Sequence, residues 1–506
     1  MDRIAEKSAA ASPQFVSVVG AALTGLVAIA LLAQLGEVTP RRVASVALFA
    51  AVFGIAYITK RPKEVLLFSF IFALTYNRQY FVLQGALGNP GTQGPYVIPA
   101  DAFFFSLLGL WLYELIVLKR RSLPQGTAMW PWYLPFAFAC TLSVLVASRV
   151  DWSLFELVRV AKVGLILWYT RRNLGPRTWW ICVGALGAAL SVQSVLGILE
   201  VAFHHSGVLW VIGLGSQDQI IPQALEAESF YGWTRAQATM NHPPNLACYL
   251  LLTVPLFVAL AVTHPERSRR RLCALTAIVG LGGLGCTLSR FPIILMALML
   301  FILLLGLAAL RTMQVKHSIA LLSIGILITA GAGVAFSDFI TQRVNRDWKA
   351  SVDQRLGGYR AALSMYRDGD PWLGVGLNNY RMHMLKYEPE LEWIDKYESL
   401  ALDMNVRFPA APENAYLFVL AETGVVGLIG FGIYLCGLFY TGVRGVVATH
   451  GHYRAASLGL LIGFTGVLLQ QSIDHSYWVD PILYSTALVM GLVNNANSVS
   501  QTEHSR

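Results

Sequence analysis

An acidic residue stands at the predicted start of a long apolar segment, where a carboxylate can exchange a proton with a bound molecule. Glu413 follows Pro412, a residue that suits the first turn of a helix. A carboxylate at the boundary between water and membrane gains from the helix dipole, so Glu413 is a candidate general base or a capping acid. Glu422 lies about 180° further around the same helix and is expected to serve packing or a second site.

Three charged residues at helical spacing fall inside the apolar segment 153–170. Glu156, Arg159 and Lys162 are three residues apart, so neighbouring members share a helix face. Ionised groups at membrane depth are costly unless paired or hydrated, and they point to a functional site by default. A structural Glu156–Arg159 ion pair between packed helices is the alternative. Because one acid cannot neutralise two bases, Arg159 and Lys162 are expected to bind an anion.

Further basic residues face the same predicted compartment. Arg290 occupies a tight turn between two apolar segments, where it either snorkels to the surface or binds an anion at the outer mouth. Arg235 precedes another such segment. Arg355 and Arg360 border the apolar face of a predicted helix, which carries Leu356, Tyr359, Leu363 and Tyr366 at helical spacing. A helix of this kind is expected to lie on the membrane surface over the mouth of a cavity.

The last predicted outer loop carries a cluster of titratable and aromatic side chains, Asp474, His475, Tyr477 and Asp480. We expect these residues to help line the same entrance, and His475 is a second candidate for the base.

These residues must be positioned by membrane-spanning helices. The chain has 506 residues, of which 55% are hydrophobic and only 13% charged. Soluble proteins carry about 25% charged residues. We predict an all-α polytopic membrane protein with about 14 spans, and place them at 15–35, 43–59, 64–76, 98–118, 130–148, 153–170, 178–200, 244–263, 272–289, 291–310, 318–337, 414–440, 455–471 and 480–494.

Charge in the short loops predicts the orientation. Loops on one side are rich in Lys and Arg, such as residues 60–63 and 267–271, whereas the other side carries few. By the positive-inside rule both termini are cytoplasmic. The net charge of +9 is therefore a topology signal and does not require nucleic acid as a partner.

The sequence predicts a simple domain organisation. Helices 1–11 occupy residues 1–337 and include an extracytoplasmic loop at 201–243. A long extracytoplasmic loop with short amphipathic helices spans 338–413, helices 12–14 occupy 414–494, and residues 495–506 form a disordered cytoplasmic tail. The six cysteines all lie in apolar segments and are expected to be buried hydrophobes, and no motif predicts a metal site.

Four segments, in this order, resemble motifs of the O-antigen ligase/polymerase family of bacterial membrane glycan transferases. They are Met240 to Ala247; Leu288 to Arg290; Arg355 through Asp370 to Tyr380; and Glu413 to Leu417 with Glu422, Gly424 and Gly427. The resemblance covers residues 230–440 well. This chain departs from the family at Glu413, because the family usually has histidine there and that histidine is thought to be the base. A carboxylate does the same work if partial burial raises its pKa.

The resemblance implies glycosyl transfer at the outer face of a bacterial inner membrane, without a cofactor or metal. The donor is a polyprenyl-diphosphate-linked glycan, and the acceptor is a glycan or glycolipid whose hydroxyl gives its proton to Glu413 as it attacks with inversion. Guanidinium and ammonium groups suit the diphosphate. The candidate substrate-binding residues are Arg159, Lys162, Arg235, Arg290, Arg355, Arg360, Asn414 and His475.

Two alternatives stay open. Within the family, the enzyme is either a ligase or a polymerase, and the glutamate departure favours a polymerase of O-antigen or exopolysaccharide, with a chain-length regulator as its partner. From a different class, a transporter or flippase of lipid-linked sugars is the competing interpretation. Transporters often contain internal repeats. This sequence has no evident repeat and concentrates its polar residues in one outer loop, which favours surface chemistry.

Overall fold

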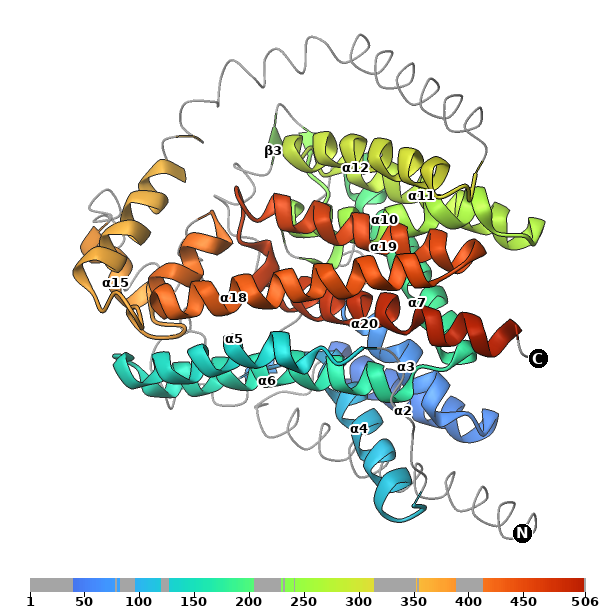
Figure 1. Ribbon diagram of the computed structural model, residues 1–506, viewed down its shortest axis with the longest axis horizontal. Helices are drawn as coiled ribbons and strands as arrows, with labels where there is room; N and C mark the ends of the chain where they lie inside the picture. The colour runs from blue at the N-terminus through green and yellow to red at the C-terminus, as the bar shows by residue number, and fades with distance from the viewer. Residues whose placement is uncertain are drawn as a thin grey trace.

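The computed structural model describes residues 40–77, 80–81, 96–119, 127–203, 229–230, 233–240, 242–313, 352, 355–387 and 413–504. Helices dominate this part of the chain (Figure 1), so the predicted all-α fold is confirmed. The strands in these segments form only two short antiparallel hairpins, β1 (Tyr80–Phe81) with β2 (Tyr96–Val97) and β3 (Ser229–Phe230) with β4 (Trp233–Thr234).

Twelve of the predicted spans fall on described helices, and the spans predicted at 15–35 and 318–337 lie outside the described residues. The twelve helices are α2 (Pro40–Thr59), α3 (Pro62–Ala73), α4 (Pro99–Ile116), α5 (Trp130–Ser143), α6 (Val150–Asn173), α7 (Pro176–Ala202), α10 (Pro243–Thr263), α11 (Arg267–Cys286), α12 (Arg290–Ala309), α18 (Ala415–Ala448), α19 (Gly451–Gln470) and α20 (Asp480–His504). Short 3-10 helices are η1 (Val144–Val146), η3 (Ala238–Met240) and η5 (Ser476–Trp478).

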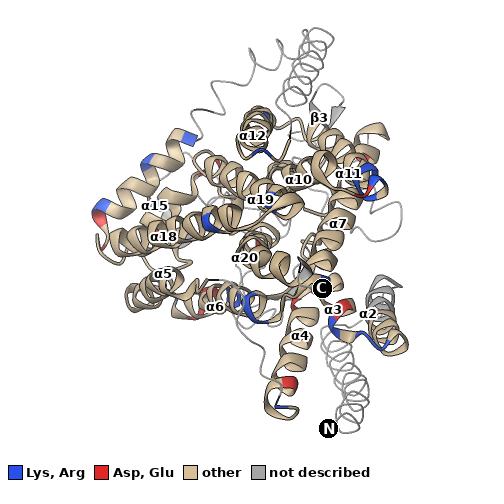
Figure 2. Ribbon diagram, turned by 45° about the vertical axis from the view of Figure 1, so that its right-hand side comes forward, with Lys and Arg blue, Asp and Glu red and all other residues tan. Residues whose placement is uncertain are grey.

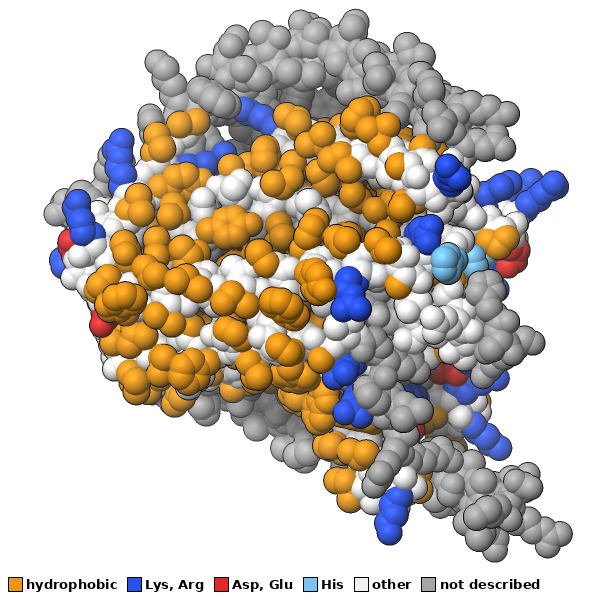
Figure 3. Space-filling model, viewed as in Figure 1, with side chains coloured by type: hydrophobic (Ala, Val, Ile, Leu, Met, Phe, Trp, Pro, Cys, Tyr) orange, Lys and Arg blue, Asp and Glu red, His pale blue; other side chains and the backbone are white. Residues whose placement is uncertain are grey.

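Six of the described helices are long and apolar enough to cross a membrane. They are α4, α7, α10, α12, α18 and α19. Apolar side chains cover much of the face seen in Figure 3. Many large apolar side chains are substantially exposed, for example Ile294, Phe301, Ile429 and Phe138. Such a face suits contact with lipid. The protein is therefore a multi-pass membrane protein, and the total of about 14 spans stays a prediction.

The centre of the bundle is α10, which packs against α19 through small residues. A Cβ atom at Gly463 would lie 2.2 Å from the Leu252 carbonyl oxygen, and one at Gly459 would lie 2.6 Å from that of Pro255. Membrane helices commonly pack this closely at small residues, because their backbones approach where side chains are short. Because these glycines allow close packing, the carboxyl end of α19 and the loop after it lie beside the start of α10.

Many of the helices, including α5, α6, α12, α18 and α20, run roughly along one direction in Figure 1, so the bundle has two ends, whereas α4 is steeply inclined to them. One end carries α15 (Tyr380–Tyr387) and the starts of α10, α12, α18 and α20. The carboxyl end of α20 lies at the opposite end (Figure 1). The basic turn at Arg267–Arg271 begins α11 (Figure 2). The helix order thus separates the basic loops from the loops predicted to be extracytoplasmic.

Two predicted boundary segments can be compared with the structure. The predicted amphipathic helix is present over residues 355–368, but Leu356 and Leu363 remain exposed, while Ala362 and Met365 form its buried face. The predicted disordered tail is wrong for residues 495–504, because α20 continues to His504. Val499 is fully buried and extends the packed face of this helix. Most of the predicted loop 338–413 outside 355–387 lies beyond the described residues.

Candidate functional site

The start of α18 is fixed by a side-chain cap. Asn414 has extended backbone geometry, and its Oδ1 accepts the N–H groups of Tyr416 and Leu417, both at 3.0 Å. This is the usual N-cap arrangement, which satisfies amides that the helix itself leaves unpaired. The N–H of Ala415 donates in turn to the carbonyl oxygens of Gln471 (3.0 Å) and Asp474 (3.2 Å). Glu413 is therefore held beside the loop that joins α19 to α20.

Glu413 pairs with Arg355, which lies on the helix described over residues 355–368. About a third of each side chain remains exposed, 34% for Glu413 and 37% for Arg355. The hydroxyl of Tyr359, one turn further along, donates to the carbonyl oxygens of Glu413 and Ser472, both at 3.1 Å. Desolvation raises the pKa of Tyr359 above its ordinary value, so it stays a neutral donor. A helix distant in sequence thus brings a cation to the predicted base.

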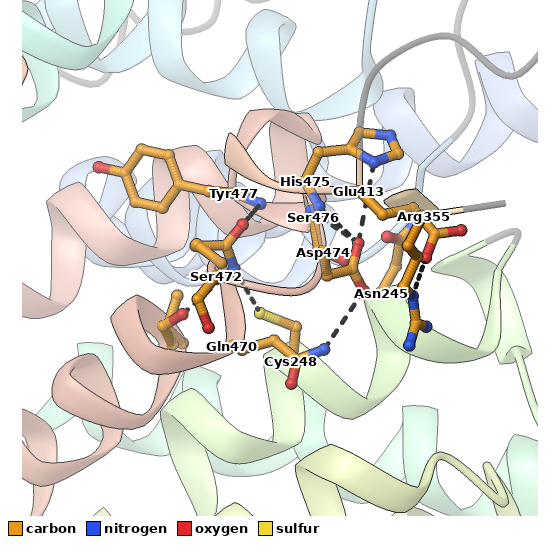
Figure 4. A network of polar contacts seen from close by, with 12 residues as sticks. Asn245, Cys248, Arg355, Glu413, Gln470, Ser472, Asp474, His475, Ser476 and Tyr477 are labelled. Carbon is orange, nitrogen blue, oxygen red and sulfur yellow. Dashed lines mark hydrogen bonds and ion pairs between the residues drawn. The ribbon is translucent and has the colours of Figure 1, made fainter. Parts of the chain in front are cut away.

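The loop after α19 completes this group of residues (Figure 4). Asp474 Oδ1 accepts the N–H of His475 (2.6 Å) and of Ser476 (3.1 Å), and its Oδ2 accepts from Gln470 Nε2 (3.2 Å). The His475 Nδ1 atom lies 3.9 Å from Asp474 Oδ1. The two side chains are close enough to form an ion pair when the imidazole ring carries a proton. His475 and Asp474 therefore add an acid–base pair next to the Arg355–Glu413 pair.

A sharp break in α18 holds the 355–368 helix in place. Gly424 has a φ of +64°, and a Cβ atom there would lie 2.3 Å from the Trp372 carbonyl carbon. The segment after the 355–368 helix docks into this break, because Val375 N donates to Ala421 O (2.9 Å) and Val425 N donates to Pro371 O (3.0 Å). Only glycine tolerates both this φ and this approach.

Glu422 occupies the same break and is buried. Its carboxylate accepts the N–H groups of Asn378 (2.8 Å) and Tyr380 (3.1 Å). The loop it holds also reaches α6, since Asn379 Oδ1 accepts the N–H of Arg149 (2.7 Å). Glu422 thus fixes the loop that carries the 355–368 helix, which agrees with the predicted packing role.

Arg159 and Lys162 sit in a different environment from the one predicted. Arg159 is buried and pairs with Glu156 (2.7 Å) and with Asp480 of α20 (2.8 Å). Lys162 pairs with Asp101 of α4 at 3.1 Å. Three carboxylates thus face two cations. The expectation that one acid must serve two bases is wrong, because two of the acids come from helices distant in sequence.

Arg235 binds the turn that precedes α12, which begins at Arg290. Arg235 donates to the Thr287 carbonyl oxygen (3.1 Å) and to the Ser289 hydroxyl (3.2 Å), and Arg290 is the next residue. Leu288 within this turn has a φ of +51°. These two arginines form a second basic group, built from elements other than those that carry Glu413. Arg360 is exposed on the 355–368 helix.

Sequence reasoning missed several residues that build the site. Tyr359 was assigned only to an apolar face, and Ser472 was not singled out, yet both bind the backbone or side chains around Glu413. Ser472 contributes its backbone carbonyl oxygen, which any residue can supply, so the residue type gave no signal.

Comparison with known proteins finds a similarity in one part of the chain. Residues 247–432 match the family model described as O-antigen ligase, and this range contains Arg290, Arg355, Glu413 and the break at Gly424. No curated protein matches the chain. Residues 247–432 of this membrane protein are therefore similar to the O-antigen ligase family.

Proposed function

We propose that this protein transfers a polyprenyl-diphosphate-linked glycan to an acceptor hydroxyl at the end of the bundle that carries Glu413. The observation that carries this proposal is the Arg355–Glu413 pair, a partly exposed cation and carboxylate held together at the start of α18 within the family match. A diphosphate needs a cation, and an attacking hydroxyl needs a proton acceptor. This pair supplies both.

The reaction follows from these two roles. The acceptor hydroxyl oxygen attacks the anomeric carbon, the bond from that carbon to the diphosphate oxygen breaks, and the hydroxyl proton passes to Glu413. The polyprenyl diphosphate leaves with the bonding electron pair, and the anomeric configuration inverts. Arg355 binds the departing diphosphate with its planar guanidinium. Arg235, Arg290, Arg360, Asn414 and His475 are proposed to bind the rest of the donor or the acceptor.

The pair also implies an order of events. Without donor, Arg355 is occupied by Glu413. An incoming diphosphate competes for the same guanidinium, so donor binding releases the Glu413 carboxylate to act as the base. Arg159 and Lys162 are left out of the diphosphate site, because neighbouring carboxylates already neutralise both.

Among the activities of this family we favour the polymerase, with a second lipid-linked repeat as the acceptor and a chain-length regulator as partner. The support is Glu413 in place of the family's histidine, which points to a changed acceptor. The site then faces outward from a bacterial inner membrane, with both termini in the cytoplasm, as the positive-inside rule predicts.

A complementation experiment tests the proposal. The gene is deleted in its host, wild type or Arg355→Ala is restored, and surface polysaccharide is compared with extracted polyprenyl-linked glycans. Accumulation of single lipid-linked repeats supports a polymerase, whereas full-length lipid-linked polymer supports a ligase. If the repeats stay on the cytoplasmic side, the protein is a transporter and the proposal is wrong. Arg355→Ala is expected to fail at normal protein level.

A further inference from the structure

A single arginine joins the membrane-embedded ion pairs to the loop of the proposed site. The Arg159 guanidinium donates from Nε to Asp480 Oδ1 (2.8 Å) and from Nη2 to the Trp478 carbonyl oxygen (2.5 Å). Trp478 ends η5 and Asp480 begins α20, so both contacts fall at the far end of the loop after α19. Arg159 and Asp480 are almost fully buried, with 6% and 1% of their surface exposed.

The near end of the same loop belongs to the site. Asp474 and His475 directly precede η5, and the Asp474 carbonyl oxygen accepts the N–H of Ala415 at the start of α18. Gln471 Oε1 also accepts the N–H of Tyr477 (2.7 Å), which ties the two ends of the loop together. A shift of Trp478 and Asp480 would therefore move the acid–base pair and the residue next to Glu413.

The geometry points to Arg159 as a positioning residue: through Trp478 and Asp480 it fixes the loop that places His475 and Glu413 for glycosyl transfer. The loop has hydrogen bonds of its own, such as the one from Tyr477 N–H to Gln471 Oε1, and Arg159 adds a buried anchor at its far end. A buried arginine with several hydrogen bonds is rigid, because leaving any of its partners unpaired is costly. This inference rests on the proposed function, since it gives Arg159 a role in that reaction without contact with the donor.

Glu156 provides a matched control. It pairs with Arg159 through both carboxylate oxygens (2.9 and 2.7 Å) from one turn earlier on α6. Its side chain is buried like that of Arg159, but its contact lies within α6 and not on the loop. Glu156→Gln thus weakens the same ion-pair network while leaving Arg159 on Trp478 and Asp480.

Enzyme kinetics distinguish a positioning role of Arg159 from a role in donor binding. They are measured on the purified full chain in nanodiscs, with lipid-linked glycan extracted from the deletion strain as donor. For Arg159→Gln we expect kcat to fall about 100-fold, the cost of a small misplacement of reacting groups. The KM for donor and the binding of undecaprenyl diphosphate should stay unchanged. Arg159→Lys should be intermediate, because it keeps the charge but loses the fork of hydrogen bonds. Glu156→Gln should keep the wild-type kcat.

Several outcomes would overturn the inference. Loss of undecaprenyl diphosphate binding in Arg159→Gln would make Arg159 a donor ligand instead. An equal loss of kcat in Glu156→Gln would assign the effect to the network as a whole. A wild-type protein without transfer activity would refute the proposed function but not the loop anchor. That anchor is tested separately by the rate of maleimide labelling at Ser472→Cys, which should rise with Arg159→Gln; an unchanged rate contradicts it.

Discussion

At the scale of single residues, Glu413 and Arg355 each restrict what the other can do. While they are paired, the carboxylate is not available to a hydroxyl and the guanidinium is not available to a diphosphate. Both side chains are partly exposed, so water weakens their attraction. A pair of this strength can hold the empty site together and still give way to a doubly charged ligand.

Replacement of Glu413 by Gln separates binding from turnover. Without the base we expect turnover to fall at least about 100-fold. Undecaprenyl diphosphate should bind about two- to five-fold more tightly, because a partly exposed carboxylate no longer competes for Arg355. Titration of the purified protein with that lipid measures the affinity. Glu266→Gln, in an exposed pair with Arg269 at the start of α11, is the control and should change neither quantity. Weaker lipid binding in Glu413→Gln would contradict the competition.

The residues of the site were predictable from the sequence to different degrees. Glu413 and Arg355 lie in recognisable motifs, which predict a base and one of several diphosphate ligands, but the sequence does not predict that these two side chains pair. The acids that neutralise Arg159 and Lys162 were not found, because Asp480 and Asp101 lie far from them along the chain. A one-dimensional pattern shows a charge inside a span but not its partner on another helix.

At the scale of elements, the N-cap of α18 determines where Glu413 lies. Replacing Asn414 by Ala removes the acceptor for two amides and should destabilise the helix start by about 0.5–2 kcal/mol. We expect a lower thermal midpoint and a loss of turnover larger than the change in stability explains, because Glu413 adjoins the cap. Asn414→Asp keeps the acceptor oxygen but loses the hydrogen bond that Asn414 Nδ2 donates to the Ser472 carbonyl oxygen, so it should restore the midpoint only in part. If Asn414→Ala left turnover unchanged, the cap would not position Glu413.

The break in α18 provides a second prediction at this scale. Gly424→Ala places a Cβ atom against the Trp372 backbone and forces alanine into a left-handed conformation, at a cost of about 1–3 kcal/mol. The 370–380 segment should undock, and turnover should be lost with it. Gly432→Ala lies in the same helix with nothing within 4 Å of its Cβ and should behave as wild type. Proteolysis of the 370–380 segment, faster only in Gly424→Ala, checks the undocking.

Helix positions were predicted well, whereas their interruptions and ends were not. Hydrophobic runs locate spans because lipid requires them. Gly424 looks like an ordinary small residue of a membrane helix until the segment that docks against it is known. The sequence also predicted too early an end for α20. The residues after 494 are mostly polar, so the sequence does not show that one face of this helix stays buried through Val499.

At the scale of the whole molecule, the two ends of the bundle differ in charge and in contents. The group around Glu413 lies where α18 begins, and the basic turn at Arg267–Arg271 lies where α11 begins, after α10 has crossed from the first end. The order of apolar spans and basic loops in the sequence predicted that successive helices begin at opposite ends of the bundle. It could not indicate which outer loops contact each other. The contact between the 355–368 helix and the loop after α19 depends on packing across the whole bundle.

The orientation of the bundle decides whether the site can meet an exported donor. Ser472 is exposed beside Glu413, and Ser268 is exposed in the basic turn. In intact cells an impermeant maleimide should label Ser472→Cys, whereas Ser268→Cys should react only after permeabilisation, because the basic end faces the cytoplasm. Wild type supplies the background from its own cysteines, most of which are buried or half-buried. The reverse pattern would place Arg355 and Glu413 in the cytoplasm, where donor exported to the outer face is absent, and would refute the proposed transfer reaction.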